Sequence, residues 1–322
     1  MSKYKEIDIT KITPVSVKTR DSKVETDQMA SVPQPGMKLS DFIKGLPPVL
    51  ASADFKFIVQ KVADARMNDK PVLLMMGAHV IKTGLGPVII DLMENGILQG
   101  IAVNGAGAIH DSELAYFGKT SEDVARFLKD GKFGMAKETA EILNTSADLA
   151  RKEKLGFGEA LGKKVSEDSP EFINLSIFAN AYRLNIPVTV HVAIGTDIVH
   201  QHPGANGDAV GDASMRDFRI FSELVSKIGD GGVVLVFGSS VILPEVFLKA
   251  LTVARNIYGS IINFYTANFD MIRHYRPHMN VLTRPVQDGG RGVAITGHHE
   301  IMFPLLAAAV KEEMLSRGLL KM

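Results

Sequence analysis

The sequence predicts an α/β protein built on a doubly wound, mainly parallel β-sheet. Short apolar runs, each long enough for one buried strand, alternate with longer stretches that have the 3.6-residue apolar spacing of helices. Small residues follow most of these runs, which is typical of strands that end at one edge of a parallel sheet. About six or more strands are expected, and the predicted ones are 72–76, 97–103, 186–193, 232–237, 261–265 and 292–296.

Length and composition restrict the classes of protein that this chain can belong to. Its 322 residues, 46% of them hydrophobic, can form one large α/β domain or two smaller ones. The net charge is zero, so no general attraction to nucleic acid or to an anionic membrane is expected. No apolar run reaches the roughly 18 residues of a membrane-spanning helix, and the polar N-terminus does not resemble a signal peptide. We therefore expect a cytoplasmic protein that acts on a small molecule, without a nucleic-acid or membrane partner.

Two classes of catalytic site are disfavoured by the residues present. The chain has no cysteine, which excludes disulfides, thiolate nucleophiles and cysteine-based metal sites. A serine hydrolase is also disfavoured, because Gly238-Ser239-Ser240-Val241-Ile242 lacks the G-x-S-x-G pattern of a nucleophile elbow.

The first 36 residues are predicted to form a separate segment. They lack sustained periodicity, and Pro33-Gln34-Pro35-Gly36 separates them from the rest of the chain. We interpret 1–36 as an N-terminal arm, with at most one short strand, and 37–322 as a single α/β domain.

Helices are predicted between the strands where apolar residues recur at helical spacing. In 53–67, for example, Phe55, Ile58 and Val62 fall on one face. Residues 119–170 are mostly polar and predict solvated helices, whereas 204–213 predicts a loop rich in Gly, Asp and Ala. The other predicted helices are 39–46, 84–93, 171–184, 215–228, 244–257 and 302–317.

The first strand–helix–strand unit contains the candidate ligand site. The strand 72–76 ends in Gly77, and the strand 97–103 ends in the small-residue turn Asn104-Gly105-Ala106-Gly107. Ligands of open α/β sheets bind outside the carboxyl ends of the strands, where small residues let backbone N–H groups approach a phosphate. The alternative is that these glycines only serve tight turns.

All nine histidines fall in loops or near the ends of predicted strands. His200 and His202, together with His298, His299 and Glu300, have donors that suit zinc or iron. The helical ligand pair H-E-x-x-H is absent, so a metal-dependent hydrolase stays an alternative and no metal ligand is assigned.

Two of these segments resemble known families. GAHVIKTG (77–84) followed by AVNGAGAIHDSEL (102–114) resembles the NAD-binding half of deoxyhypusine synthase. The turn Gly105-Ala106-Gly107 followed by His110-Asp111 also resembles the NAD-dependent archaeal-type ornithine cyclodeaminase domain.

Further motifs extend the resemblance to deoxyhypusine synthase over roughly residues 40–315. Gly238-Ser239-Ser240 stands where the family has a glycine triplet, and Thr266-Ala267 with Phe269-Asp270 resembles its T-A-x-x-F-D turn. Arg276-Pro277 and the segment 303–306 are similar to its R-P and F-P-L-L motifs and have the same separation.

The resemblance implies a Rossmann-like fold, NAD as cofactor, and a homotetramer with sites formed across a dimer interface. The cofactor-binding residues that it implies are Gly77, His79, Lys82, Thr83, Gly84, Asn104, Gly105, Ala106, Gly107, Gly238, Ser239, Thr266, Ala267 and His298.

The departures from the family indicate a different substrate. The family's lysine forms an imine with the aminobutyl group, and a gapless count places Pro285 there; proline cannot form a Schiff base. At the positions of the family's acidic polyamine pocket this chain has Arg273, His274 and His278, and these side chains would repel a polycation. We therefore expect a deoxyhypusine synthase-like, NAD-dependent enzyme that does not act on spermidine, and transferase, lyase and oxidoreductase chemistry all stay open.

The candidate catalytic residues are His110, Asp111, Asp197 and Arg276. We expect His110 and Asp111 to form an acid/base pair in which Asp111 orients the imidazole ring. Arg276, with Arg273 and Arg284, would bind an anion. A catalytically silent nucleotide-binding scaffold is the remaining alternative.

Overall fold

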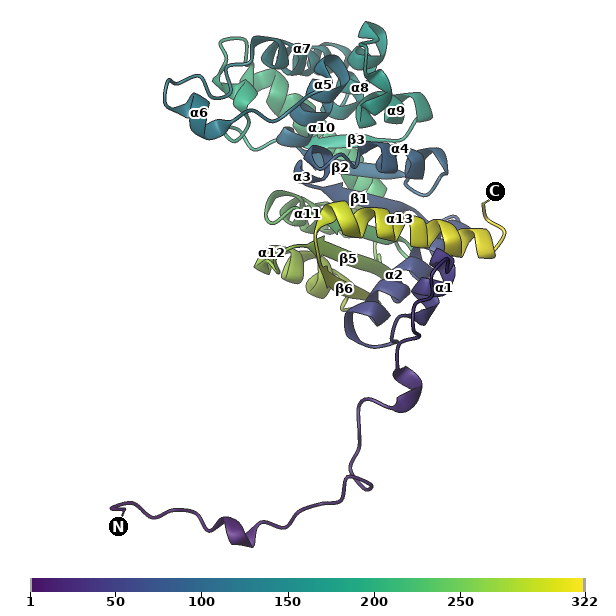
Figure 1. Ribbon diagram of the computed structural model, residues 1–322. Coiled ribbons are helices and arrows are strands. Elements are labelled where there is room, and N and C mark those ends of the chain that lie inside the picture. The colour runs from purple at the N-terminus through teal and green to yellow at the C-terminus, as the bar shows by residue number, and fades with distance from the viewer. Residues whose placement is uncertain (1, 321–322) are drawn as a thin grey trace.

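Parallel strands with buried side chains form the centre of the structure, a computed structural model that describes residues 2–320. Within these residues one six-stranded sheet has the order β3-β2-β1-β4-β5-β6, and every neighbouring pair is parallel (Figure 1). The strands are β1 (Val72–Met76), β2 (Gly100–Asn104), β3 (Val188–His191), β4 (Val233–Phe237), β5 (Phe264–Asp270) and β6 (Gly290–Thr296). The predicted doubly wound, Rossmann-like fold is therefore confirmed.

The strand order places the topological switch point between β1 and β4. The chain adds β2 and β3 on one side of β1, then returns to add β4, β5 and β6 on the other side. Leu73 pairs with Val234, and beyond the strands the Gly77 N–H still donates to the Phe237 carbonyl at 2.9 Å. Because connections leave this edge in opposite directions, a crevice for ligands is expected here.

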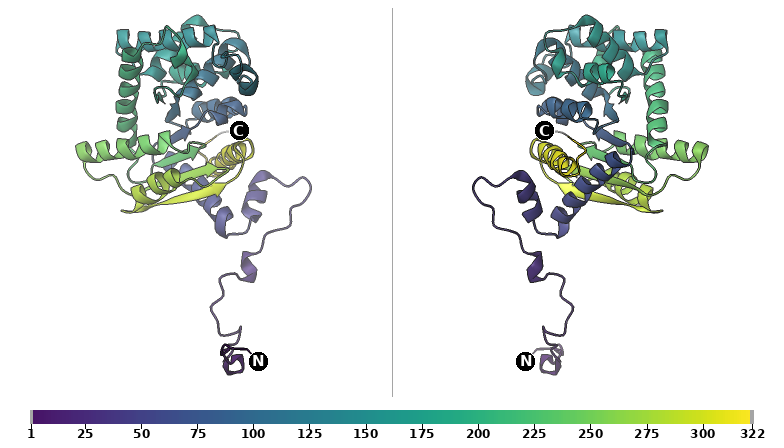
Figure 2. Two further views of the ribbon diagram at one scale, coloured as in Figure 1. Left: turned by 90° about the vertical axis from the view of Figure 1, so that its left-hand side faces the viewer. Right: turned by 90° about the vertical axis from the view of Figure 1, so that its right-hand side faces the viewer.

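Helices cover both faces of the sheet (Figure 2), and alternate residues of β1 face these two layers. Val72, Leu74 and Met76 belong to one apolar cluster, together with residues of α2 (Leu50–Met67), α4 (Gly86–Glu94) and α13 (His299–Ser316). Leu73 and Met75 belong to a second cluster with α10 (Gly207–Val225) and α11 (Ile242–Tyr258). A strand buried on both faces reads as an uninterrupted apolar run, which is why β1 could be predicted from VLLMM.

The outer edge of β3 is covered by side chains of α10. The Val190 N–H donates to Asp217 Oδ2 at 2.7 Å, and the Val192 N–H donates to Ser214 Oγ at 3.0 Å. Ser214 returns a hydrogen bond from its hydroxyl to the Val190 carbonyl at 3.0 Å. These bonds satisfy backbone groups that an edge strand would otherwise present to another chain.

The β2–β3 end of the sheet is covered by a group of helices drawn at the top of Figure 1. They are α5 (Gly105–Phe117), α6 (Val124–Leu128), α7 (Lys137–Glu153), α8 (Phe157–Asp168) and α9 (Ile177–Leu184). The remaining α-helices are α1 (Leu39–Gly45), α3 (His79–Lys82) and α12 (Tyr275–Pro277), and α12 continues into a π-helix, His278–Thr283. None of the helices in residues 2–320 has both the length and the apolar character that crossing a bilayer requires.

Residues 2–36 run away from the helices and strands as an extended, exposed segment (Figures 1 and 2). They contain the short 3₁₀ turns Ile9–Lys11 and Thr26–Gln28, and this described part of the arm forms no strand. A backbone hydrogen bond of 2.9 Å joins the Ser31 N–H to the Gly45 carbonyl of α1.

Several predicted boundaries were wrong. The loop predicted after the second strand, Gly105-Ala106-Gly107, is in fact the first helical turn of α5. Asn104 is the N-cap of this helix, and its Oδ1 accepts from the Gly107 N–H at 3.1 Å. The small residues of 204–213 predicted a loop, but α10 begins at Gly207. Ala209 and Ala213 form the buried face of this helix, where small side chains allow close packing.

Two further elements begin at a different residue from the predicted one, because of a helix cap in one case and strand pairing in the other. The helix expected at 171–184 begins at Ile177, because Ser176 caps it by accepting from the Ala179 N–H. The strand expected at 261–265 is displaced to Phe264–Asp270, where it pairs with both β4 and β6. Thr266 and Ala267 therefore lie inside a central strand and not in a loop.

Candidate functional site

A cavity of about 190 Å³ lies at the carboxyl ends of β2 and β3, next to the first turn of α5. We call it the His110 cavity. It contains two of the four candidate catalytic residues, His110 and Asp197, and two of the candidate cofactor residues, Lys82 and Ala106. Its complete lining is Lys82, Ala106, Ile109, His110, Glu113, Ser121, Glu122, Val124, Phe133, Thr196, Asp197 and Ile198.

His110 is held by a hydrogen-bonded series that reaches Glu113 through Thr120. His110 Nδ1 lies 2.6 Å from Thr120 Oγ1, and the Thr120 hydroxyl donates its single hydrogen to Glu113 Oε2. The hydroxyl must then accept from the ring, so Nδ1 carries the proton. Nε2 consequently has a free lone pair, which is the arrangement that a general base needs.

Glu113 provides the negative charge at the end of this series. Thr139 Oγ1 also donates to it, at 2.9 Å, and Oε2 lies 3.7 Å from His110 Nδ1. Burial raises the pKa of Glu113, but hydrogen bonds from His110, Thr120 and Thr139 outweigh burial and hold this pKa below its usual value. An ionised Glu113 would stabilise a protonated His110.

The expected pairing of His110 with Asp111 was wrong. Asp111 is buried and points away from the ring, accepting from Ser176 Oγ and from the Ile177 N–H, both at 2.6 Å. Its carboxylate therefore lies at the N-terminus of α9, where it contributes to the fold. Burial raises the pKa of Asp111 to about 6, despite these hydrogen bonds.

Asp197 lies against Gly105 at the start of α5. A Cβ on Gly105 would overlap the Asp197 carboxylate, so glycine is required for this approach. Burial raises the pKa of Asp197. A carboxylate thus already occupies the space beside the first residue of α5, and its charge would oppose a phosphate at the same position.

The switch point between β1 and β4 brings Gly77 and Gly238 into contact. A Cβ on Gly77 would overlap the Gly238 carbonyl oxygen, and Gly238 has a φ of +61°, a conformation that favours glycine. Ser239 Oγ accepts from the Leu243 N–H at 3.3 Å and so caps the start of α11. We call this region, with the neighbouring His79 and His299, the switch crevice, because the strand order predicts a ligand crevice here.

His299 is an unpaired polar side chain in the switch crevice that sequence reasoning did not assign to the cofactor. It is 1% exposed, and neither ring nitrogen has a hydrogen-bond partner among the described residues. Its ring centroid lies 5.7 Å from that of His79 and 6.1 Å from that of Phe237. Burial lowers the pKa of His299, which therefore favours a neutral ring.

The neighbouring His298, one of the predicted cofactor residues, is exposed where His299 is buried. Its side chain is 63% exposed at the N-cap of α13, and its Nδ1 is 3.8 Å from Glu300 Oε1. The doubled histidine was visible in the sequence, but the choice between the two rings depends on where α13 begins.

The other predicted cofactor residues do not share one place: Thr83 and Gly84 lie in the connection after β1, whereas Thr266 and Ala267 lie inside β5. Thr83 Oγ1 donates to the His79 carbonyl at 3.1 Å, just before Gly84 in the connection to α4. Thr266 is fully buried and donates to the Val281 carbonyl at 2.9 Å, while Ala267 is also fully buried.

The arginine residues do not line the His110 cavity. Arg276 Nε lies 3.1 Å from Glu245 Oε1, and Arg284 donates to Asn280 Oδ1 at 2.8 Å. Arg276 is thereby neutralised by a carboxylate of this chain, which does not support the expected role in binding a substrate anion.

Two of the histidines considered for metal binding, His200 and His202, form hydrogen bonds with backbone groups. His200 Nδ1 accepts from the Gly195 N–H at 3.2 Å, and His202 Nε2 lies 2.8 Å from the Gly134 carbonyl. Among residues 2–320, no three His, Asp or Glu side chains are grouped as metal ligands. The structure therefore does not support the metal-dependent hydrolase.

Comparison with curated proteins confirms the resemblance to deoxyhypusine synthase. The chain is 24% identical over 276 residues to a probable deoxyhypusine synthase 2 of Methanosarcina mazei, covering 76% of this chain and 71% of that protein. It is 21% identical over 244 residues to a deoxyhypusine synthase-like protein of Chlorobaculum parvum, covering 66% and 68%. No known family description matches the chain.

Comparison with solved structures supports the fold. AgrE in complex with ornithine and NAD⁺ superposes with a TM-score of 0.55 at 13% identity, covering 82% of this chain. This chain spans 33% of the length of AgrE, so the likeness concerns one part of that larger protein. The chain is thus similar in sequence to deoxyhypusine synthase-like proteins, and it has a Rossmann-like fold that is also found in AgrE.

Proposed function

We propose that the chain is an NAD-dependent enzyme on a deoxyhypusine synthase-like scaffold, and that its small-molecule substrate is not spermidine. The observation that carries this proposal is the series from His110 through Thr120 to Glu113 at the wall of the His110 cavity. It leaves one ring nitrogen free to exchange a proton at the edge of the sheet where Rossmann-like folds bind ligands. Similarity to deoxyhypusine synthase-like proteins and the NAD⁺ complex of AgrE support the choice of cofactor.

The residues of the switch crevice fit a dinucleotide. Gly77 and Gly238 let the backbone of β1 approach that of β4 closely, and both ring nitrogens of His299 are buried without a hydrogen-bond partner in the described chain. Leaving such groups unpaired costs about 1–3 kcal/mol each, and a polar ligand would remove this cost. The backbone from Gly77 to Gly84 and the Gly238-Ser239 turn would hold NAD, with Asn104 to Gly107 on the side of the His110 cavity.

NAD, when bound, would supply a hydride acceptor next to the substrate. The chain's own contribution would be acid–base chemistry. His110 Nε2 would take a proton from the substrate, and Glu113, 3.7 Å from Nδ1, would stabilise the imidazolium that forms. Asp197, which shares the cavity, would accept a hydrogen bond from a hydroxyl or amino group and orient the substrate.

The exclusion of spermidine rests on Pro285. Its backbone carbonyl accepts from Arg255 Nη2 at 3.0 Å and its side chain is buried, so this position offers no amine for an imine. Lys82 is the one lysine among the residues that line the His110 cavity, and it is therefore the lysine to test for any residual imine chemistry.

Calorimetric titration of the purified chain with NAD, followed by an assay with spermidine, NAD and the translation-factor acceptor, tests the proposal. We expect saturable NAD binding and no aminobutyl mass increment on the acceptor lysine. An increment would overturn the altered substrate, and its loss in Lys82→Ala would identify the amine used. Absence of NAD binding at millimolar concentration would instead favour a scaffold without cofactor chemistry.

We also propose that residues 37–322 act as one domain within a homotetramer. The proposal is supported by closed symmetry as the usual outcome for such enzymes and by nine exposed large apolar side chains between Tyr4 and Val32. Light scattering at micromolar concentration is expected to give the mass of four chains. Only monomer at this concentration would contradict it.

A further inference from the structure

Residues 119–134, which connect α5 to α7, cover one side of the His110 cavity. Four of the residues that line this cavity belong to the connection, namely Ser121, Glu122, Val124 and Phe133. The connection contains the short helix α6, which Figure 1 shows at the margin of the molecule, away from the sheet. No side chain of α6 is buried. We call residues 119–134 the α6 segment.

The α6 segment is held together mainly by its own hydrogen bonds. Within the described chain, every hydrogen bond that residues 121–133 form has its partner inside 121–135. Glu122 Oε1, for example, accepts from the Gly134 N–H at 2.8 Å, which closes the segment on itself. A unit of this kind can move as a whole, because its internal bonds do not connect it to the rest of the fold.

The segment is joined to the rest of the molecule next to two glycines. Gly118, the C-cap of α5, has a φ of +62°, and Gly134 has a φ of +75°. The Gly134 carbonyl lies 2.8 Å from His202 Nε2, and a Cβ on Gly134 would lie 2.8 Å from Ile198 Cβ. Both ends thus have backbone conformations that favour glycine, and such positions can absorb the dihedral changes of a hinge.

Thr120 lies near the first of these ends, two residues after Gly118. Its hydroxyl accepts from His110 Nδ1 and donates to Glu113, so a residue of the α6 segment completes the hydrogen-bonded series. His110 and Glu113 both belong to α5 and would not move with the segment. Displacement about Gly118 would separate Thr120 from the ring, and His110 would lose the group that fixes its tautomer.

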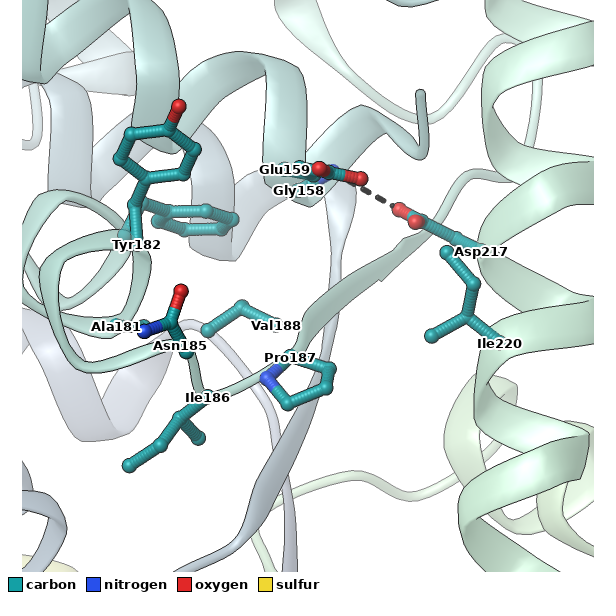
Figure 3. Close-up of a pocket in the computed structure, with 11 residues that line it drawn as sticks. Gly158, Glu159, Ala181, Tyr182, Asn185, Ile186, Pro187, Val188, Asp217 and Ile220 are labelled. Carbon is teal, nitrogen blue, oxygen red and sulfur yellow. Dashed lines mark hydrogen bonds between the residues drawn. The ribbon is translucent and has the colours of Figure 1, made fainter. Parts of the chain in front are cut away.

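A second cavity in the same half of the molecule has no such cover. Its volume is about 270 Å³, and it lies at the amino end of β3, between α8, α9 and α10 (Figure 3). Each of these three helices has buried side chains that attach it to the core. The loosely attached wall is therefore a feature of the His110 cavity that the second cavity does not share.

We propose that the α6 segment is a lid on the His110 cavity, and that its closure prepares His110 for proton transfer. The inference rests on the proposed role of His110 as the base. A substrate in the cavity would contact Val124 and Phe133 of the lid and Ile198 of the body, and these contacts would favour the closed position. Thr120 is then a positioning residue, which reaches Nδ1 only while the lid shields the substrate from water.

Pulsed electron paramagnetic resonance tests whether the lid moves, because the chain has no cysteine and spin labels can be placed at chosen sites. One pair of labels joins the lid to the body, Leu128→Cys with Lys152→Cys. A reference pair lies within the body, Lys152→Cys with Glu167→Cys, and all three side chains are exposed. We expect two populations of distance for the first pair and one for the reference pair. A single, equally narrow distance for both pairs would overturn the lid.

Gly134→Ala and Gly131→Ala provide a matched pair of variants. Gly131 has a φ of +65°, so a methyl group strains the backbone at both positions. The methyl group of Gly134→Ala would also overlap Ile198, whereas a Cβ on Gly131 meets nothing within 4 Å. We expect Gly134→Ala to increase the ratio of open to closed lid at least threefold and Gly131→Ala to leave it as in the wild-type chain. Equal effects of the two variants would contradict the hinge at Gly134.

Nitrogen-15 spectra of the histidine rings test the coupling between the lid and the base. We expect His110 to be protonated at Nδ1 in the wild-type chain and in Gly131→Ala, and to shift toward protonation at Nε2 in Gly134→Ala. An open lid with an unchanged His110 ring would overturn the role of closure.

Calorimetric titration with NAD separates this inference from the proposed function. NAD affinity should be the same in Gly134→Ala as in the wild-type chain, since the switch crevice lies outside the lid. A tenfold loss of affinity would mean that the variant disturbs more than the lid and would contradict the assignment of its effects to the hinge. Absence of NAD binding in the wild-type chain would contradict the proposed cofactor and leave the distances and ring spectra as evidence for the lid.

Discussion

Glu113 Oε2 lies 3.7 Å from Nδ1 of His110, one helical turn away on the same face of α5. The Thr120 hydroxyl bridges the two groups and fixes which ring nitrogen carries the proton. This contact gives His110 a defined tautomer and a nearby negative charge, which are the two properties that proton transfer by an imidazole requires.

The first prediction concerns the tautomer of His110. In the wild-type chain the neutral ring should be protonated at Nδ1, because Thr120 has no second hydrogen to donate. Thr120→Val removes the acceptor, and the ring should shift to the tautomer protonated at Nε2. Nitrogen-15 correlation spectra of the histidine rings measure this directly, with His110→Gln to assign the signal. Protonation at Nε2 in the wild-type chain would contradict the proposed base.

The second prediction concerns the backbone contact at the switch point. Gly77→Ala places a methyl group on the Gly238 carbonyl, so β1 and β4 must separate, and we expect a loss of several kcal/mol in the free energy of unfolding. Gly207→Ala is the control, since a Cβ there meets nothing within 4 Å. Urea denaturation compares the two variants. Similar stabilities would show that the contact is easily relaxed.

The third prediction separates His299 from His298. His299→Phe removes two unpaired ring nitrogens from a site next to Phe237, and should raise the free energy of unfolding by about 1–2 kcal/mol. The same variant should weaken NAD binding at least tenfold, because a hydrogen-bonding group of the crevice is lost. His298→Asn, which keeps a good N-cap residue, should change neither quantity. Calorimetric titration with NAD and urea denaturation are the measurements, and the opposite result would restore His298 as the cofactor residue.

The fold could be predicted from the sequence because its central strands are buried on both faces. VLLMM of β1 and VVLVF of β4 are continuous apolar runs, and the parallel order follows from the helices between them. The placement of His110 and Asp197 at one edge could be predicted for the same reason.

The partner of His110 could not be predicted as long as Gly105 was assigned to a turn. Once α5 begins at Gly105, a three-residue separation places Glu113 on the face of His110, while Asp111 points about 100° away. The contact of Asp111 with Ser176 joins residues 65 apart in the sequence, and local pattern carries no information about it. The same holds for the choice between His298 and His299, which depends on the first residue of α13.

The last prediction concerns the pH dependence of stability and follows from Asp217. The pKa of this carboxyl group rises from 3.8 to about 8 on folding, so between these values the folded chain holds a proton that the unfolded chain has released. The free energy of unfolding must therefore fall as the pH rises, and the loss is complete above about pH 8.

Other buried groups act at lower pH. The pKa of Asp111 is also raised on folding, to about 6, so Asp111 too lowers the free energy of unfolding as the pH rises, but its contribution is lost by about pH 6. Burial lowers the pKa of His191 from 6.5 to about 3, so His191 raises the free energy of unfolding as the pH rises. This increase ends near pH 6.5, the pKa of the unfolded chain. Between pH 7 and 8 the wild-type chain should lose about 1 kcal/mol in the free energy of unfolding through Asp217. Urea denaturation at the two pH values should show this slope, Asp217→Asn should remove it, and Asp208→Asn, exposed on the same helix, should retain it. An unchanged slope in Asp217→Asn would mean that the carboxyl group is ionised in the folded chain at neutral pH.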